Sequence, residues 1–136
     1  IPEDMGNYTY APGKWTIKEV LCHIIDTERV MVYRALRFAR NDMTELAPFE
    51  QDEFVQNGRH NERNFDSIIE EFIHLRKANL ILFKNFNDTE LERKGMASGR
   101  LITVKAFLYV VAGHLSHHRI ILRERYLNNE NVEPLV

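Results

Sequence analysis

Apolar residues recur at helical spacing in three long segments of this chain, at about residues 16–40, 66–86 and 103–127. In each segment they form a stripe along one face, which consists of Ile17, Val20, Ile24 and Met31, then of Ile68, Phe72, Leu75, Leu82 and Phe86, and last of Phe107, Val111 and Ile121. A helix with one apolar face buries that face against other helices. The pattern therefore predicts an all-α protein built from amphipathic helices.

Polar residues mark the points where these helices are expected to begin. Thr16 and Glu19 form the T-x-x-E pattern of a capping box, which starts the first helix. Asp66 or Ser67 is the expected N-cap of the second helix, and Thr103 is the expected N-cap of the third. The three starts are thus predicted from local sequence alone.

The connections between the long helices carry shorter predicted elements. Residues 41–64 form a long polar connection, and loops beyond about 12–15 residues are uncommon in compact domains unless they have a function. We expect a short helix at about residues 52–56, a helical turn in the TELERK segment and a hairpin-like link at 95–102. Phe49 and Phe54 offer apolar lining, so the long connection is expected to shape a substrate entrance.

The number of helices raises the question of what completes the core. The 136 residues are predicted to form a single domain over residues 1–136, long enough for a proper core. Three long helices make a poor closed bundle and four make a good one. We therefore expect that an upstream helix absent from this sequence, or a partner chain, completes the bundle. A homodimer is expected, with Ile25 and Phe38 on the back of the first helix among the residues left for the partner.

Charge and cysteine content exclude several classes of protein. The net charge is -2 with both signs interspersed, which argues against a nucleic-acid partner because such proteins need a basic face. The single cysteine, Cys22, excludes an internal disulfide and a multi-cysteine zinc site, and it agrees with a cytoplasmic location. No apolar run approaches the roughly 18 residues of a membrane span, so no membrane is expected as a partner.

Two histidines one helical turn apart, His114 and His118, lie on the apolar face of the third segment. At this spacing their side chains can share one metal ion. An imidazole turned into an apolar seam needs a partner, because burying an unpaired polar group costs a few kcal/mol. Hydrogen bonds to a carboxylate or to water are the alternative to a metal. His117, about 80° around the helix from the midpoint of the pair, could replace one of them or support them.

A third ligand candidate is His23, at the edge of the apolar face of the first segment. Asp26 and Glu19 lie within one helical turn and could orient its ring. The alternative is a surface histidine paired with Asp26, which the spacing favours about equally. The other histidines are weaker candidates: His60 is expected to be solvated in a polar loop, and His74 is expected to be exposed.

The segments APGKWTIKEVLCHIIDTERVMVYRALRFARND and VAGHLSHHRIILRERYL together resemble the DinB-like superfamily of metal-dependent hydrolases. Members of that family have a tryptophan before the second helix, then a glutamate, a histidine and further acidic residues, and an H-x-x-x-H pair on the last helix. The matching residues here are Trp15, Glu19, His23, Asp26, Glu28, His114 and His118. The similarity covers residues 8–127, and we expect the family's first helix to be the part that this sequence lacks.

The resemblance implies an antiparallel four-helix bundle with a divalent transition metal, zinc or nickel, held by His23, His114 and His118 and open to further ligands. Asp26 is the preferred supporting group, and the further candidates are Glu19, Glu28 and His117. The implied function is an enzyme acting on a small molecule, either by hydrolysis or by transfer of a low-molecular-weight thiol. A non-enzymatic helical module for ligand binding or dimerisation, with a structural or vestigial metal site, is the alternative.

Overall fold

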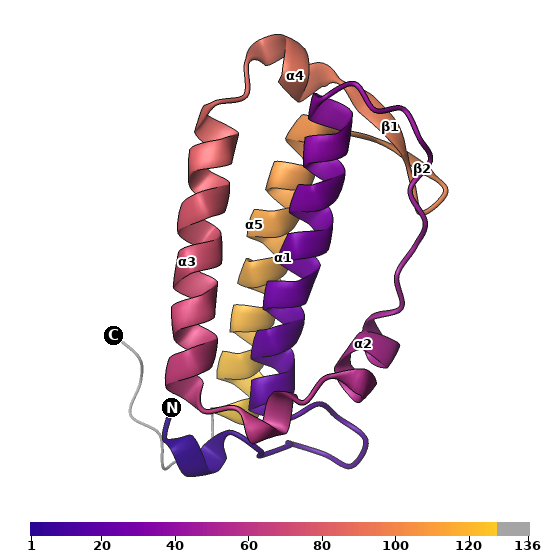
Figure 1. Cartoon of the computed structure of the whole chain (residues 1–136). Helices are drawn as coiled ribbons and strands as arrows, with labels where there is room; N and C mark the ends of the chain where they lie inside the picture. The colour runs from indigo at the N-terminus through magenta and orange to yellow at the C-terminus, as the bar shows by residue number, and fades with distance from the viewer. Residues whose placement is uncertain (128–136) are drawn as a thin grey trace.

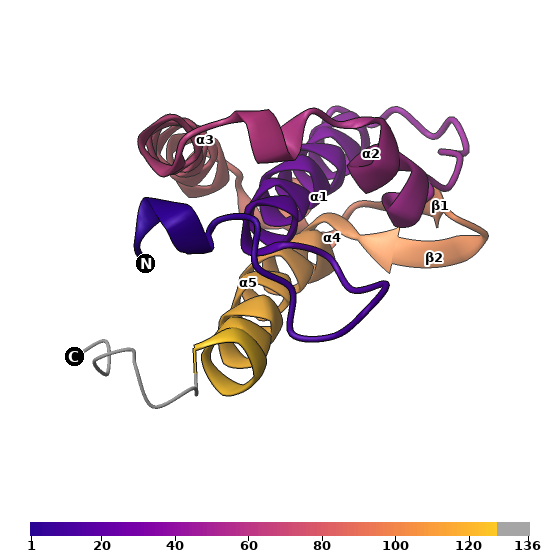
Figure 2. The same ribbon diagram turned by 90° about the horizontal axis from the view of Figure 1, so that it is seen from below.

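Three long helices lie side by side in the computed structural model, which describes residues 1–127 (Figure 1). They are α1 (Ile17–Ala39), α3 (Phe65–Lys84) and α5 (Val104–Ile121), and a π-helical turn (Leu122–Tyr126) continues α5. Helix α1 lies between the other two when the bundle is viewed along its axis (Figure 2). The mainly helical bundle predicted from the periodicity is confirmed. None of the helices in residues 1–127 combines the length and apolar character needed to cross a membrane.

The direction of the helices explains the length of the connection after α1. Helices α1 and α3 run in the same direction, and α5 runs opposite to both (Figure 1). The chain must therefore return along the whole of α1 before α3 can begin. At 1.5 Å per residue the 23 residues of α1 extend for about 35 Å, a distance that no short turn can cover.

The returning connection is partly ordered into short elements. It contains α2 (Gln51–Asn57) and a 3-10 turn (His60–Glu62), and another 3-10 turn (Glu3–Met5) precedes α1. After α3 come α4 (Asp88–Glu92) and an antiparallel hairpin of β1 (Lys94–Ala97) and β2 (Arg100–Thr103). The predicted short helix, helical turn and hairpin link are thus all present. A single parallel bridge from Leu46 to Ala97 fastens the returning connection to the hairpin.

Side-chain caps start the long helices, and one of them differs from the prediction. The hydroxyl of Thr16 accepts a hydrogen bond from the Glu19 amide at 3.1 Å, and the Glu19 carboxylate accepts one from the Thr16 amide at 2.7 Å. This is the predicted capping box, and Thr103 caps α5 as expected. Helix α3 begins earlier than predicted, because the side chain of Asn64 rather than that of Asp66 or Ser67 is the cap.

The core lies around α1, which is buried on most of its circumference. Phe38 packs against Phe107 of α5 with ring centroids 5.9 Å apart, under the β-hairpin. Gly95 of β1 is required there, because a Cβ atom would lie 2.4 Å from the Phe38 ring. Between α1 and α3, the buried carboxylate of Glu28 accepts hydrogen bonds from Arg76 at 2.7 and 3.2 Å and from Asn79 at 2.9 Å. Each oxygen of this buried carboxylate thus has a hydrogen-bond partner inside the chain.

The prediction that the back of α1 faces a partner chain is wrong. Ile25 and Phe38 are only 2% and 0% exposed, because α3 and α5 cover the back of α1 within one chain. The exposed apolar side chains lie mainly on α3 and α5 instead, and they include Ile69, Ile73, Leu80, Ile81, Tyr109 and Ile120. The homodimer itself stays a prediction.

Candidate metal centre

Three histidines from two helices converge on one point of the bundle. His23 projects from α1, and His114 and His118 project from successive turns of α5. The Nε2 atom of His114 lies 3.0 Å from Nε2 of His23 and 3.1 Å from Nε2 of His118. One ligand atom from each residue lies within 4.8 Å of the others. The pair predicted from local spacing and the more distant His23 are thus brought together.

The donor set fits a divalent transition metal. Two nitrogen ligands that each lie about 2.0–2.1 Å from a tetrahedral zinc ion are about 3.3 Å apart. The Nε2 atom of His114 lies close to that distance from its neighbours, at 3.0 and 3.1 Å, and the ligand atoms of all three histidines lie within 4.8 Å of one another. Each neutral imidazole offers one lone pair, and an ion at the centre would satisfy all of them at once. The geometry therefore matches a site with three imidazole ligands.

Burial keeps these imidazoles neutral. Burial, and to a smaller extent the neighbouring His114 and His118, lower the pKa of His23 from its ordinary value of 6.5 to about 3. Burial is also the main reason that the pKa of His118 falls to about 4 and that the pKa of His114 is lowered. A metal ligand must be deprotonated. All the imidazoles of the cluster therefore have lone pairs available at neutral pH.

The second nitrogen of each ring decides how firmly the ring is oriented. The Nδ1 atom of His23 lies 3.4 Å from the hydroxyl oxygen of Thr27, one turn further along α1. The ring of Trp15 also packs on His23, with centroids 4.7 Å apart. The Nδ1 atom of His118 is buried and has no hydrogen-bond partner within residues 1–127. His23 is thus the best-supported ring of the cluster.

A pocket of about 330 Å³ opens beside His118. Its walls come from the segment before α1, from α1, from α2 and from the end of α5, and they are formed by Tyr10, Gly13, Lys14, Trp15, Val20, Asp52, His118, Ile121 and Tyr126. Tyr126 donates a hydrogen bond to the carbonyl oxygen of Trp15 at 2.7 Å, which holds the segment before α1 against α5. His118 is the histidine of the cluster that lines this pocket.

The supporting residues expected from the sequence have other contacts in the structure. Asp26 lies 3.8 Å from Arg29, and no contact within residues 1–127 joins it to the histidine cluster. Glu19 caps α1 and accepts a hydrogen bond from Asn61 at 3.0 Å, whereas Glu28 is bound by α3. His117 is exposed, with its ring centroid 5.2 Å from that of His118. Of these candidates, His117 lies nearest to the cluster.

Several residues beside the site were missed or misplaced by the sequence analysis. The sequence analysis did not predict that Thr27, Lys14 or Asp52 lies beside the site. The aromatic residues and the turn sequence before Trp15 were the one signal that could have pointed to Lys14. The long connection does reach the pocket, but through Asp52 of α2. Phe49 and Phe54 pack on each other instead, with ring centroids 5.2 Å apart.

The predicted exposure of the remaining histidines is wrong for His60 and right for His74. His60 is half-buried rather than solvated, and its Nε2 atom is enclosed without a hydrogen-bond partner in the described part of the chain. Its ring packs against Gly58, where a Cβ atom would lie 2.1 Å from Nε2. His74 is exposed on α3, as expected.

Comparison with known proteins agrees with the geometry. The model of the DinB superfamily matches residues 1–122. The chain belongs to the DinB superfamily. A search of curated proteins gave no match.

Among solved structures, this DinB-superfamily chain is similar to YfiT from Bacillus subtilis, described as a probable metal-dependent hydrolase with an unusual four-helix bundle topology. The TM-score is 0.73 at 14% sequence identity, and the match covers 90% of this chain and 74% of YfiT. At this identity the likeness concerns the fold. The four-helix bundle class expected from the resemblance is thereby confirmed.

Proposed function

We propose that this protein is a metal-dependent enzyme acting on a small molecule, with one divalent ion held by His23, His114 and His118. The observation that carries this proposal is the convergence of the Nε2 atoms beside a pocket of about 330 Å³. A site with three protein ligands and room for others is typical of catalytic rather than structural metals. The description of YfiT as a probable metal-dependent hydrolase also supports the proposal of a metal-dependent enzyme.

The chemistry of the donors narrows the choice of metal and reaction. Imidazole suits several transition metals, and zinc or nickel is the proposed occupant. When bound, such an ion supplies Lewis acidity, which activates water or a thiol as a nucleophile and polarises the bond under attack. Hydrolysis of a small substrate and transfer of a low-molecular-weight thiol are the two reactions proposed. Among residues 1–127, those that line the pocket include no serine or cysteine, so the pocket's side chains are proposed to serve in binding and proton transfer.

The residues of the pocket have distinct proposed roles. Trp15 and Ile121 provide apolar walls for the body of the substrate. Lys14 provides a positive charge that binds an anionic group, and the Asp52 carboxylate accepts a proton from the nucleophile or returns one to the leaving group. The Tyr126 hydroxyl holds the wall in place, because it is already bound to the Trp15 carbonyl.

Metal content is the first test of this proposal. Untagged protein purified without added metal should contain about one divalent ion per chain by elemental analysis. Substitution of His23, His114 or His118 by alanine should remove it. His74→Ala, at an exposed position of α3, is the matched control and should retain it. Wild-type protein without bound metal, even after incubation with zinc and nickel, would contradict the proposal.

Turnover is the second test, and it separates the enzyme from a metal-stabilised binding module. Panels of small esters, and of electrophiles with a low-molecular-weight thiol, are assayed against His114→Ala as the baseline. We expect turnover above this baseline, with a fall of about 100-fold in Asp52→Asn. Failure of both panels, together with a drop of tens of degrees in the melting temperature of His118→Ala, would favour a structural metal.

A further inference from the structure

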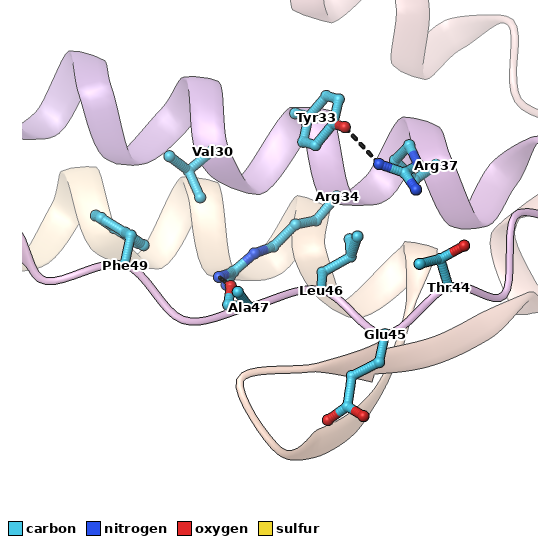
Figure 3. A pocket seen from close by; sticks show the side chains of 9 residues that line it. All are labelled: Val30, Tyr33, Arg34, Arg37, Thr44, Glu45, Leu46, Ala47 and Phe49. Carbon is cyan, nitrogen blue, oxygen red and sulfur yellow. Dashed lines mark hydrogen bonds between the residues drawn. The ribbon is translucent and has the colours of Figure 1, made fainter.

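A second pocket, of about 350 Å³, lies between α1 and the returning connection. Figure 3 shows its side chains, which come from one face of α1 and from residues 44–49 opposite: Val30, Tyr33, Arg34, Arg37, Thr44, Glu45, Leu46, Ala47 and Phe49. None of the three histidines of the metal centre lines it. This pocket is therefore a separate feature of the molecule.

A buried guanidinium, that of Arg34, points into this pocket (Figure 3). Arg34 is 6% exposed, and its Nη2 atom donates hydrogen bonds to the carbonyl oxygen of Ala47 at 2.7 Å and to the hydroxyl of Ser98 at 3.1 Å. A guanidinium carries five N–H donors. The Nε and Nη1 groups of Arg34 make no hydrogen bond within residues 1–127. Donors are thus left over at the pocket.

The charge of Arg34 is not balanced inside the described part of the chain. No carboxylate of residues 1–127 forms an ion pair with it. The neighbouring Arg37 pairs with Asp42, and the Glu45 side chain points away from Arg34 (Figure 3). Burial lowers the pKa of the Arg34 guanidinium, and no nearby carboxylate opposes that shift. A buried charge without a counter-charge is costly, and an anion bound in the pocket would offset that cost.

The other walls of the pocket indicate which anion fits. Val30 and Leu46 are apolar, and the ring of Phe49 lies 5.7 Å from the Arg34 guanidinium carbon. One unbalanced positive charge matches one negative charge, whereas a phosphate dianion would leave one negative charge unneutralised in a pocket that Glu45 also lines. We propose that this pocket binds a small organic monocarboxylate, with its carboxylate on Arg34 and its apolar body against Val30, Leu46 and Phe49.

Benzoate tests this proposal on the full chain, with benzamide as its neutral analogue and inorganic phosphate as the alternative anion. Binding is followed by amide chemical shifts in NMR spectra. We expect saturable shifts around residues 30–37 and 44–49, and affinity for benzoate at least about tenfold higher than for benzamide or phosphate, because the ion pair is charge-assisted. Equal binding of benzamide, or tighter binding of phosphate, would overturn the proposed ligand class.

Variants separate the charge of Arg34 from its structural bonds. Arg34→Gln keeps an N–H donor for Ala47 and Ser98 but loses the charge, and should weaken benzoate binding at least about tenfold. If that variant does not fold, Arg34→Lys keeps the charge and should retain preference for benzoate over benzamide. Arg37→Gln, whose charge already pairs with Asp42, is the matched control and should bind within about threefold of wild type. Unchanged binding in folded Arg34→Gln would refute the site.

A last comparison separates this site from the metal centre. His114→Ala removes a proposed metal ligand outside the pocket. We expect it to bind benzoate as the wild type does. Loss of benzoate binding in His114→Ala would show that the carboxylate binds at the metal centre instead, and would overturn the proposal.

Discussion

Acidification should destabilise the metal-free protein through the histidine cluster. The pKa of His23 is about 3 and that of His118 about 4 in the folded chain, against 6.5 for an unperturbed histidine. Below pH 6.5 the unfolded chain therefore binds protons that the folded chain does not. The free energy of unfolding must fall as the pH falls, and it continues to fall until the pH reaches the folded-state pKa values.

The size of this effect does not depend on the precise folded-state pKa values. Between pH 7 and pH 5 each histidine protonates almost completely when unfolded and stays neutral when folded. This difference is worth about 2 kcal/mol for His23 and the same for His118, so about 4 kcal/mol together. His114, whose pKa is also lowered, acts in the same direction. Native domains have only about 5–15 kcal/mol of stability, so the loss should be large.

Urea unfolding at pH 7 and pH 5 measures the effect after the metal is removed with a chelator. The double variant His23→Gln, His118→Gln should lose about 4 kcal/mol less than the wild type over this range, because glutamine does not titrate. His74→Gln, at an exposed position, should behave as the wild type. The same loss of stability in the wild type and in the double variant would refute the reasoning, since other groups would then carry the pH dependence.

Three further predictions concern stability and assembly. Arg76→Met leaves the buried Glu28 carboxylate without its ion pair and should lower the free energy of unfolding, measured with urea, by about 3–5 kcal/mol. The control Arg29→Met removes a half-exposed ion pair with Glu71 and should lower it by about 1 kcal/mol or less. Thr16→Ala removes the cap of α1 and should cost about 1 kcal/mol, with an unchanged melting temperature as the contrary result. Sedimentation at tens of micromolar should show a dimer that Ile73→Glu weakens, and a clean wild-type monomer would contradict the predicted self-association.

The prediction of the fold from the sequence depended on how local each signal was. The apolar stripes and the capping box of α1 involve residues within a few turns of one another, and both are present as expected. The start of α3 was missed because Asn64, Asp66 and Ser67 are all good N-caps, and burial of Phe65 at the first position of the helix favours Asn64. The spacing of apolar residues does not indicate in which direction one helix runs relative to another, so the parallel arrangement of α1 and α3 could not be predicted from it.

The candidate site also has one part that local spacing predicts and another part that depends on tertiary packing. The spacing of His114 and His118 determines by itself that they share one helix face, because four residues complete about one turn. His23 lies 91 residues away from His114, and its contact with it depends on how α1 packs on α5. The sequence predicts Asp26 as the support for His23 because the two are close in sequence, but it is the Thr27 hydroxyl that lies 3.4 Å from Nδ1 of the ring. A difference of one position on a helix turns a side chain by about 100°, so sequence proximity alone could not choose between them.

The sequence by itself determined about where the long helices lie, which of their faces are apolar, and that His114 and His118 share one of those faces. These properties follow from backbone geometry and the identity of nearby residues. Only the tertiary structure decided that Glu28 is bound by Arg76 and that Asp52 lines the pocket beside His118. The same holds for Arg34, which faces a cavity and forms no ion pair with a carboxylate of residues 1–127. Burial lowers the pKa values of His23, His114 and His118, and it arises from contacts between segments far apart in the chain. No local sequence pattern encodes those contacts.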